Sequence, residues 1–234
     1  FFLSFSVTLL GIFAASYEIV KEKTIYARER MVNLCLWPYL LSKVIVLFGF
    51  AFVQCIALLL VVALRVSLPS EGIIFPAPIE MYGTLLLATL ASIMLGLWIS
   101  SLAPNQNSVI YIVLLALFMQ IIFAGVLFSL PSLSKPLSYL TITRYSTEAL
   151  GDTVNIPKLK ENDPSMPIIP EQRGDREEGR VRFEHQAGHL ILRWIALLSF
   201  SGLFGGLTLL TQWRKDSDES LTRKLRELSA FLQS

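Results

Sequence analysis

The sequence predicts an all-α membrane protein, a polytopic bundle of five membrane-spanning helices. Of its 234 residues 53% are hydrophobic and only 16% charged, whereas soluble domains carry about 25% charged residues. Residues 81–134 contain no Asp, Glu, Lys, Arg or His. A spanning helix needs about 20 apolar residues, so this stretch alone holds two. The chain is too apolar to be disordered, and its net charge of +2 is too small for a nucleic-acid binder.

Each predicted span is apolar on all sides, as expected of a helix in lipid. A tight polar turn at 102–107 separates the third span from the fourth. Trp194 and Trp213 bracket the last span, as residues of the membrane interface do. The five predicted spans are residues 1–17, 38–64, 81–101, 108–128 and 194–213.

The distribution of Lys and Arg predicts the orientation of the spans. The basic segment 18–37 and the basic tail belong in the cytoplasm, and the loop 66–80, which has no Lys or Arg, belongs outside. An external N-terminus follows, so we expect a further helix before it. The division expected is a membrane domain over 1–213, with an external loop at 130–189, and a charged amphipathic cytoplasmic tail over 214–234.

A charged helix is predicted over 18–31, which lacks Pro and Gly. Glu22, Tyr26 and Glu29 stand at positions i, i+4 and i+7, so they share one helix face. An amphipathic helix along the cytoplasmic surface suits docking to a soluble partner. A solvated connector is an equally good interpretation of the pattern.

Three further features concern packing. Arg28 and Arg30, on the neighbouring faces of this helix, are expected to hold it to its own domain. Lys43 lies near the end of a span and is expected to extend toward the lipid headgroups. In the last span, Gly202-x-x-x-Gly206 is a weak signal for close helix approach.

Catalytic motifs are missing from the sequence. It contains neither a phosphate-binding Gly-x-x-x-x-Gly-Lys-Ser/Thr loop nor a Gly-x-Ser-x-Gly elbow. Glu184, His185 and His189 suggest a metal site, but the order differs from His-Glu-x-x-His and no third ligand is evident. We therefore expect a polar loop there, no metal site and no catalytic residue. Residues 137–150 are too short and too polar to span, which predicts external re-entrant helices surrounded by protein.

Three blocks of sequence resemble the membrane domain of G-subfamily ABC transporters. Residues 22–30 with 39–43 look like the connecting helix of that family and the start of its third span. Residues 105–109 look like the cytoplasmic turn before the fifth span, and 123–128 with 144–150 like the gate and the re-entrant external helices. The resemblance implies six spans per subunit, of which this chain holds the second to the sixth.

The resemblance also implies partners and a mechanism. Two such domains pair as a homo- or heterodimer around a central cavity in the cell (inner or plasma) membrane, in contact with lipid and not with nucleic acid. ATP and Mg bind to nucleotide-binding domains, either upstream in the same polypeptide or on a separate subunit. No cofactor is therefore expected in this chain. ATP-driven closure passes through the connecting helix.

The matched positions imply roles for individual residues. Coupling to the ATPase is expected of Glu22, Tyr26, Glu29 and Arg30. The external gate is expected at Val126 and Leu127. The cavity wall is expected to include Leu10, Phe13, Leu114, Phe118 and Ile121. The external re-entrant motif is expected to comprise Arg144, Tyr145 and Glu148.

Two departures from the family bear on the cargo. Leu10 stands where drug-transporting members carry an aromatic clamp, and residues 130–189 contain neither Cys nor Asn-x-Ser/Thr. Both argue against drug-type specificity and for a bacterial member. We therefore predict an exporter of amphipathic or lipid-like molecules. The alternatives are a membrane-embedded lipid-modifying enzyme that uses Glu184, His185 and His189, and a non-catalytic membrane scaffold subunit.

Overall fold

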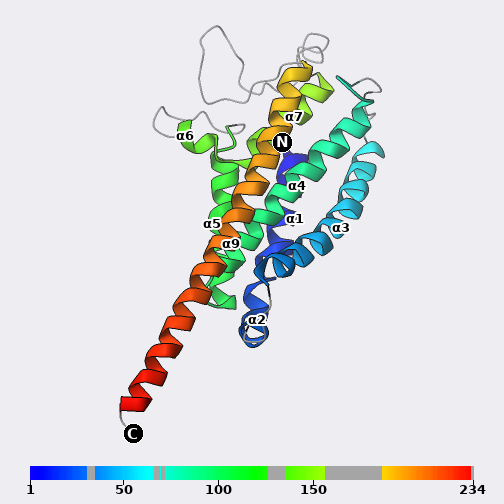
Figure 1. Cartoon of the computed structure of the whole chain (residues 1–234). Coiled ribbons are helices and arrows are strands. Elements are labelled where there is room, and N and C mark those ends of the chain that lie inside the picture. The colour runs from blue at the N-terminus through cyan, green and yellow to red at the C-terminus, as the bar shows by residue number, and fades with distance from the viewer. Residues whose placement is uncertain (31–34, 66–68, 70–71, 126–134, 156–185, 233–234) are drawn as a thin grey trace.

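The computed structural model describes residues 1–30, 35–65, 69, 72–125, 135–155 and 186–232, and all regular structure in these ranges is helical (Figure 1). Side chains of the last helix are described as far as Lys215. The longer helices are α1 (Phe2–Ser16), α3 (Leu36–Ala63), α4 (Ala77–Leu102), α5 (Gln106–Ile122), α7 (Ile142–Val154) and α9 (Ala187–Leu232). The shorter ones are η1 (Val20–Glu22), α2 (Lys23–Arg30) and α6 (Lys135–Ser138). The prediction of a polytopic helical bundle is confirmed.

Four segments of the described chain are long and apolar enough to cross a bilayer. They are Phe2–Tyr26, Leu36–Ala63, Ala77–Leu102 and Ala187–Lys215. The remaining predicted span corresponds to α5, which has 17 residues. At 1.5 Å per residue it is about 26 Å long, slightly less than the ~30 Å hydrocarbon core. Residues 126–128, the end of that predicted span, lie outside the described residues.

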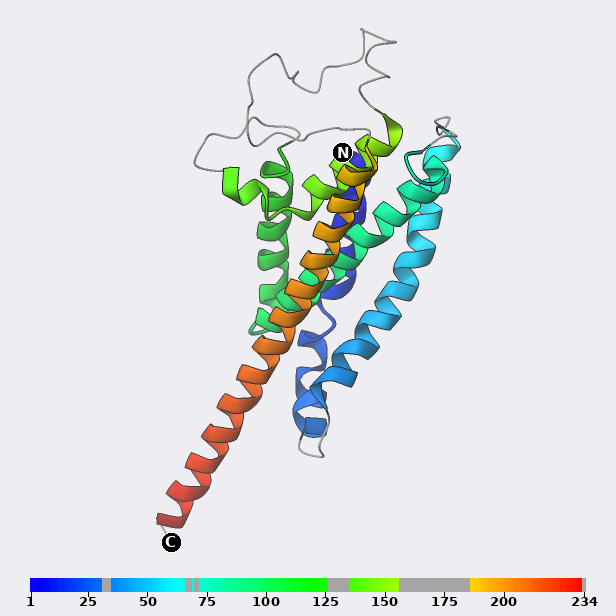
Figure 2. The ribbon, with the colours of Figure 1, turned by 45° about the horizontal axis from the view of Figure 1, so that its top comes forward.

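The last helix is longer than the span predicted within it. It begins at Ala187, before the predicted start at Trp194, and continues through the predicted tail as far as Leu232. In both ribbon views its C-terminal part extends away from the other helices (Figures 1 and 2). The membrane span and the charged tail therefore form one continuous helix in the structure.

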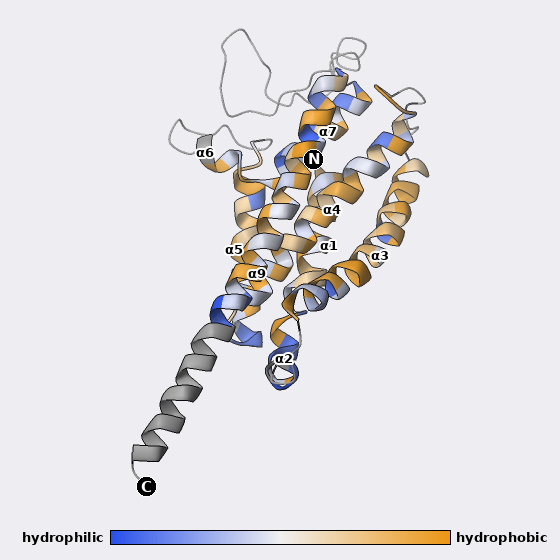
Figure 3. Ribbon diagram, viewed as in Figure 1, coloured by the Kyte–Doolittle hydropathy of each residue, from blue (hydrophilic) through white to orange (hydrophobic). Residues whose placement is uncertain are grey.

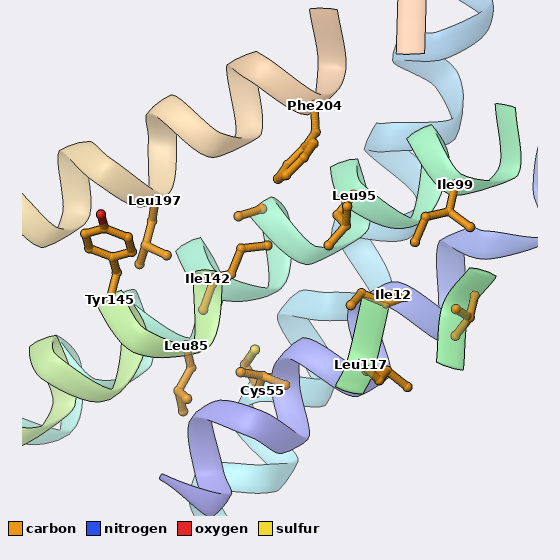
Figure 4. Close-up of a cluster of buried hydrophobic side chains, with 14 of the residues drawn as sticks. Ile12, Cys55, Leu85, Leu95, Ile99, Leu117, Ile142, Tyr145, Leu197 and Phe204 are labelled. Atoms are coloured by element: carbon orange, nitrogen blue, oxygen red, sulfur yellow. The ribbon is translucent and has the colours of Figure 1, made fainter. Parts of the chain in front are cut away.

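Helix α4 is the centre of the bundle and packs against α1, α3, α7 and α9. Two thirds (67%) of its apolar window is buried, compared with 17% for α3. Leu85, Leu95 and Ile99 of α4 meet Ile12 of α1 and Phe204 of α9 in one buried cluster (Figure 4). Helix α3 is mostly exposed in the single chain, and hydropathy colouring shows apolar residues along its length (Figure 3). In lipid, this outer apolar surface is the expected one.

Two glycines bring α1 and α4 into close contact. A Cβ at Gly96 would lie 2.6 Å from the carbonyl oxygen of Ile12, and a Cβ at Gly11 would lie 2.7 Å from Cβ of Ser92. Small residues permit such approach between membrane helices. By contrast, a Cβ at Gly202 or Gly206 would meet nothing within 4 Å. In the chain as described, the close contact is therefore not at the Gly-x-x-x-Gly pattern.

A hydroxyl group of α4 accepts two backbone hydrogen bonds at the bend between α1 and α2. The backbone N–H groups of Ile19 and Val20 both donate to Oγ of Ser100, each at 3.0 Å. Ser100 lies near the end of α4 and is buried. A helix break leaves N–H groups without intrahelical partners, and an acceptor from a neighbouring helix satisfies them. This contact ties the start of the connecting segment to the end of α4.

The short helix α7 is enclosed by protein. Its residues from Ile142 to Thr153 are all buried, and it packs against α1, α4, α5 and α9. Gln120 of α5 caps its first turn, because Oε1 accepts from the backbone N–H and the hydroxyl of Thr143 at 3.1 and 3.0 Å. Of the segment predicted at 137–150, residues 142–150 are enclosed by protein as expected, whereas Leu137, Tyr139 and Leu140 are exposed.

Candidate functional site

The structure attaches the connecting helix to α3 through ion pairs. The ammonium group of Lys43 lies 2.5 Å from Oε1 of Glu22 and 3.3 Å from Oε2 of Glu18. Glu18 also pairs with Lys21. The side chains of Lys43, Glu18 and Glu22 are 18%, 20% and 29% exposed, so water screens these pairs only in part. Lys43 thus pairs with two nearby carboxylates of the connecting segment, a contact that the sequence analysis did not predict.

An aromatic contact strengthens the same attachment. The rings of Tyr26 and Tyr39 lie 4.9 Å apart between centroids, and Tyr26 is buried. The hydroxyl of Tyr39 donates to Oε2 of Glu22 at 3.3 Å. We call these six residues, Glu18, Lys21, Glu22, Tyr26, Tyr39 and Lys43, the helix anchor.

The predicted coupling residues therefore divide into two groups. Glu22 and Tyr26 face the protein as part of the helix anchor, whereas Glu29 is exposed. The side chain of Arg30 lies outside the described residues. Arg28 donates to the carbonyl of Thr24 in its own helix at 3.4 Å. The helix anchor, which was not predicted, holds this segment to α3, and the described contact of Arg28 stays within its own helix.

At the opposite end of the bundle, the re-entrant motif forms the centre of a polar cluster. Arg144 donates from Nε to Oε1 of Glu148 at 3.1 Å and from Nη1 to the hydroxyl of Ser138. Its guanidinium carbon lies 4.6 Å from the ring centre of Tyr139. Tyr145 donates to the carbonyl of Tyr139 at 3.0 Å, and burial raises the pKa of its phenol. The three predicted residues Arg144, Tyr145 and Glu148 are therefore brought together.

Three residues of the cluster were not predicted. Arg193 of α9 pairs with Glu148, with 2.7 Å between Nε and Oε2. Its Nη2 lies 2.7 Å from Nε2 of His189, and Nδ1 of His189 lies 2.5 Å from Oδ2 of Asp152. The cluster thus holds two guanidinium groups against two carboxylates that are fully buried. Balanced charges are what a buried ionic network requires.

The sequence contained a partial signal for this cluster. His189 and Arg193 are four residues apart, a spacing that places them on one helix face. Asp152 had no such signal, because it is 37 residues away from His189 in the chain. The role of Glu80, outside this cluster, had no signal in the sequence either. It is a buried carboxylate in the first turn of α4 that accepts from the backbone N–H groups of Ile73, Ile74 and Phe75.

Of the three residues considered and rejected as a metal site, the structure describes one, His189. His189 lies in the first turn of α9 rather than in a loop, and both of its ring nitrogens have partners. Glu184 and His185 lie outside the described residues. Within the described part of the chain, no group of three His, Cys, Asp or Glu residues could hold a metal ion.

The predicted cavity-wall residues lie on the outside of the single chain. Leu10 and Phe13 of α1 are 39% and 37% exposed, and Leu114 and Phe118 of α5 are 43% and 59% exposed. Ile121 is partly exposed. Helices α1 and α5 contact each other, so these residues come from adjacent helices. The predicted gate residues Val126 and Leu127 lie outside the described residues.

Comparison with known proteins provides independent evidence on the family of the chain. A family model described as "ABC-2 type transporter" matches residues 1–153. The ABC transporter ATP-binding/permease protein Rv1747 of Mycobacterium tuberculosis is similar to this chain, with 26% identity over 162 residues. The matched region is 67% of this chain and 19% of the relative. The chain therefore spans about a fifth of the length of the curated relative it matches.

Proposed function

The chain belongs to the ABC-2 type transporter family, and from that premise we propose that it is the permease of an ATP-driven exporter of amphipathic or lipid-like molecules. It is a multi-pass membrane protein. The name of the mycobacterial relative joins an ATP-binding part to a permease part, which supports a nucleotide-binding partner domain that supplies ATP and Mg. We place the complex in the cell membrane as a dimer that works by alternating access.

The helix anchor is the observation that carries this proposal. A permease without its own ATP site must receive force through contacts with a soluble domain. Ser100 contacts the bend before α2, Lys43 of α3 pairs with Glu18 and Glu22 just before α2, and Tyr26 of α2 packs on Tyr39 of α3. Both α1 and α3 pack against the central helix α4. A displacement of α2 would therefore move three helices together, while exposed Glu29 is available to the partner domain.

The cargo proposed follows from the exposed faces of α1 and α5. Leu10, Phe13, Leu114 and Phe118 are apolar and are not covered by the rest of the described chain. If a second membrane domain faces them, they line the space between the two. Burial of apolar surface contributes about 25 cal/mol per Å², which favours apolar or amphipathic cargo over polar solutes.

The proposal is tested by reconstitution. The permease and its nucleotide-binding domain are placed together in liposomes that contain a fluorescent headgroup-labelled lipid or an amphipathic dye. We expect movement of the label that requires ATP and stops with a non-hydrolysable analogue. ATP hydrolysis without movement of either label would reject an exporter of this cargo class.

The coupling step is tested with Glu29→Ala. Because Glu29 is exposed, the substitution should leave insertion and dimerisation intact. Truncation of one partner of a charge pair at an interface costs about 2–5 kcal/mol, so we expect ATP hydrolysis to be uncoupled from transport. Thr24→Ala, at an exposed position of the same helix, is the matched control. Wild-type transport with wild-type ATP use in Glu29→Ala would contradict the coupling role.

A further inference from the structure

An open groove lies between α3 and α4, at the end of the bundle where α3 ends and α4 begins. Its volume is about 390 Å³, within the range of about 300–1,000 Å³ found for small-molecule sites. The ends of the two helices lie side by side in both ribbon views (Figures 1 and 2). The lining comprises Phe52, Ile56, Leu59, Leu60, Ala63, Pro78 and Tyr82. We call it the α3–α4 groove.

The lining of the α3–α4 groove suits a hydrocarbon chain. None of its seven residues is charged, and six have side chains without nitrogen or oxygen. The hydroxyl of Tyr82 is already engaged, because it donates to the carbonyl of Phe52 at 3.2 Å. The rings of these two residues pack edge to face, with 5.5 Å between centroids. A polar ligand would therefore lose its contacts with water and gain no hydrogen bond from these side chains.

The groove is about as long as one leaflet of a bilayer. Its α3 wall runs from Phe52, past the middle of the helix Leu36–Ala63, to Ala63 at the end of that helix. These 11 residues rise about 17 Å at 1.5 Å per residue. Half of the ~30 Å hydrocarbon core is about 15 Å. Since α3 and α4 are both long and apolar enough to span the membrane, the groove matches one acyl chain of one leaflet.

The volume of the groove excludes a whole helix as its occupant. A helix about 10 Å wide would need about 1,300 Å³ over the same length, roughly three times the volume found. Lipid tails are as apolar as leucine, so van der Waals contact, and not the hydrophobic effect, decides what packs on a membrane helix. A chain in the groove meets two helices, whereas a chain on the outer face of α3 meets one. The groove therefore gains more contacts for an acyl chain than the outer face does.

We propose that the α3–α4 groove binds one acyl chain of a bilayer phospholipid, which packs the end of α3 against the start of α4. The site does not depend on the cargo or on the direction of transport. In both ribbon views α3 and α5 lie on opposite sides of the bundle (Figures 1 and 2). The bound lipid is therefore distinct from a molecule held between the exposed faces of α1 and α5.

Photolabelling of the full chain tests the proposal. The protein is placed in phosphatidylcholine nanodiscs that contain a small fraction of phosphatidylcholine with a diazirine on one acyl chain, without ATP or a partner domain. After irradiation, the labelled residues are mapped by mass spectrometry. We expect several-fold more label on Ile56, Leu60 and Tyr82 than on Val53 and Val61, which lie outside the lining. Exposure alone predicts the opposite order on α3, because Val53 and Val61 are 66% and 62% exposed, compared with 46% and 55% for Ile56 and Leu60.

A variant that fills the groove provides the second arm of the test. Ile56→Trp places a larger side chain in the lining and should remove most of the label from Tyr82. Val61→Trp, on the same helix but outside the lining, is the matched control and should leave the label unchanged. Thermal unfolding in the nanodiscs checks the fold of each variant. Leu60→Trp repeats the measurement from the next turn of α3 if Ile56→Trp does not fold.

Three results would overturn the proposal. Equal labelling of the groove residues and of Val53 and Val61 would show only the general contact of a membrane helix with lipid. Undiminished label on Tyr82 in a folded filling variant would show that the chain lies elsewhere. A disulfide between two copies of Leu60→Cys, made with Cys35→Ser, would identify a second copy of this chain as the molecule that covers the groove.

Discussion

The carboxylate of Asp152 and the imidazole of His189 lie 2.5 Å apart and join the last turns of α7 to the first turn of α9. The second ring nitrogen, Nε2, faces Nη2 of Arg193 at 2.7 Å. A guanidinium group has donors only, so Nε2 accepts and Nδ1 carries the proton that is donated to Asp152. Asp152 and Arg193 thus specify one tautomer of His189. The pair thereby links α7 to α9, the helices on either side of residues 156–185 in the chain.

Asp152→Ala is expected to destabilise the protein. Asp152 is fully buried, and without it the Nδ1–H of His189 loses its acceptor. A buried donor left without a partner costs about 1–3 kcal/mol. Thermal unfolding in detergent should show a lower transition temperature, whereas Glu29→Ala at an exposed site should not change it. An unchanged transition in Asp152→Ala would show that the pair contributes nothing to stability.

Lys43 and Glu22 are expected to act as a unit. Their separation is 2.5 Å and both side chains are partly buried, so loss of Lys43 leaves two carboxylates without their shared cation. We expect Lys43→Gln to cost about 1–3 kcal/mol, between the values for exposed and buried pairs. A double-mutant cycle with Glu22→Gln measures the coupling between them. Strictly additive effects of the two substitutions would contradict the helix anchor.

Gly96→Ala is expected to separate α1 from α4. The added Cβ would lie 2.6 Å from the backbone oxygen of Ile12, which is not free to move away as a side-chain end would be. Overpacking of this kind costs about 1–3 kcal/mol, measurable as a lower thermal transition. Gly49→Ala is the matched control, because nothing lies within 4 Å of a Cβ there. If both variants unfold alike, the close contact of the two helices is not what Gly96 provides.

The orientation inferred from the basic loops is testable by cysteine labelling. Cys35 is exposed and Cys55 is buried, so Cys35 is first replaced by Ser. Single cysteines at Lys23 and Ser220 should then react with an impermeant reagent only after the membrane is opened. A cysteine at Asp175 should react in intact cells. The reverse pattern of reactivity would show that the chain has the opposite orientation in the membrane.

The sequence alone determined the class of protein and most helix positions. The prediction of a span at 38–64 corresponds to α3 at Leu36–Ala63, and that at 81–101 to α4 at Ala77–Leu102. These features follow from local composition, because lipid excludes charged side chains and unpaired backbone groups wherever a segment crosses it. The same logic predicted protein around the polar segment 137–150, which holds for residues 142–150 but not for the exposed Leu137, Tyr139 and Leu140.

Only the tertiary structure decided which polar groups meet. Asp152 and His189 are 37 residues apart, and Lys43 and Glu22 are 21 apart, so no local pattern joins them. The single face predicted for Glu22, Tyr26 and Glu29 is divided in the structure, because Glu22 lies in η1, Tyr26 is buried and Glu29 is exposed. The break at Val20–Glu22 and the ring of Tyr39 turn its first two members inward. Helical periodicity determines which residues share a helix face. Which residues of another helix contact that face depends on how helices distant in the sequence pack together.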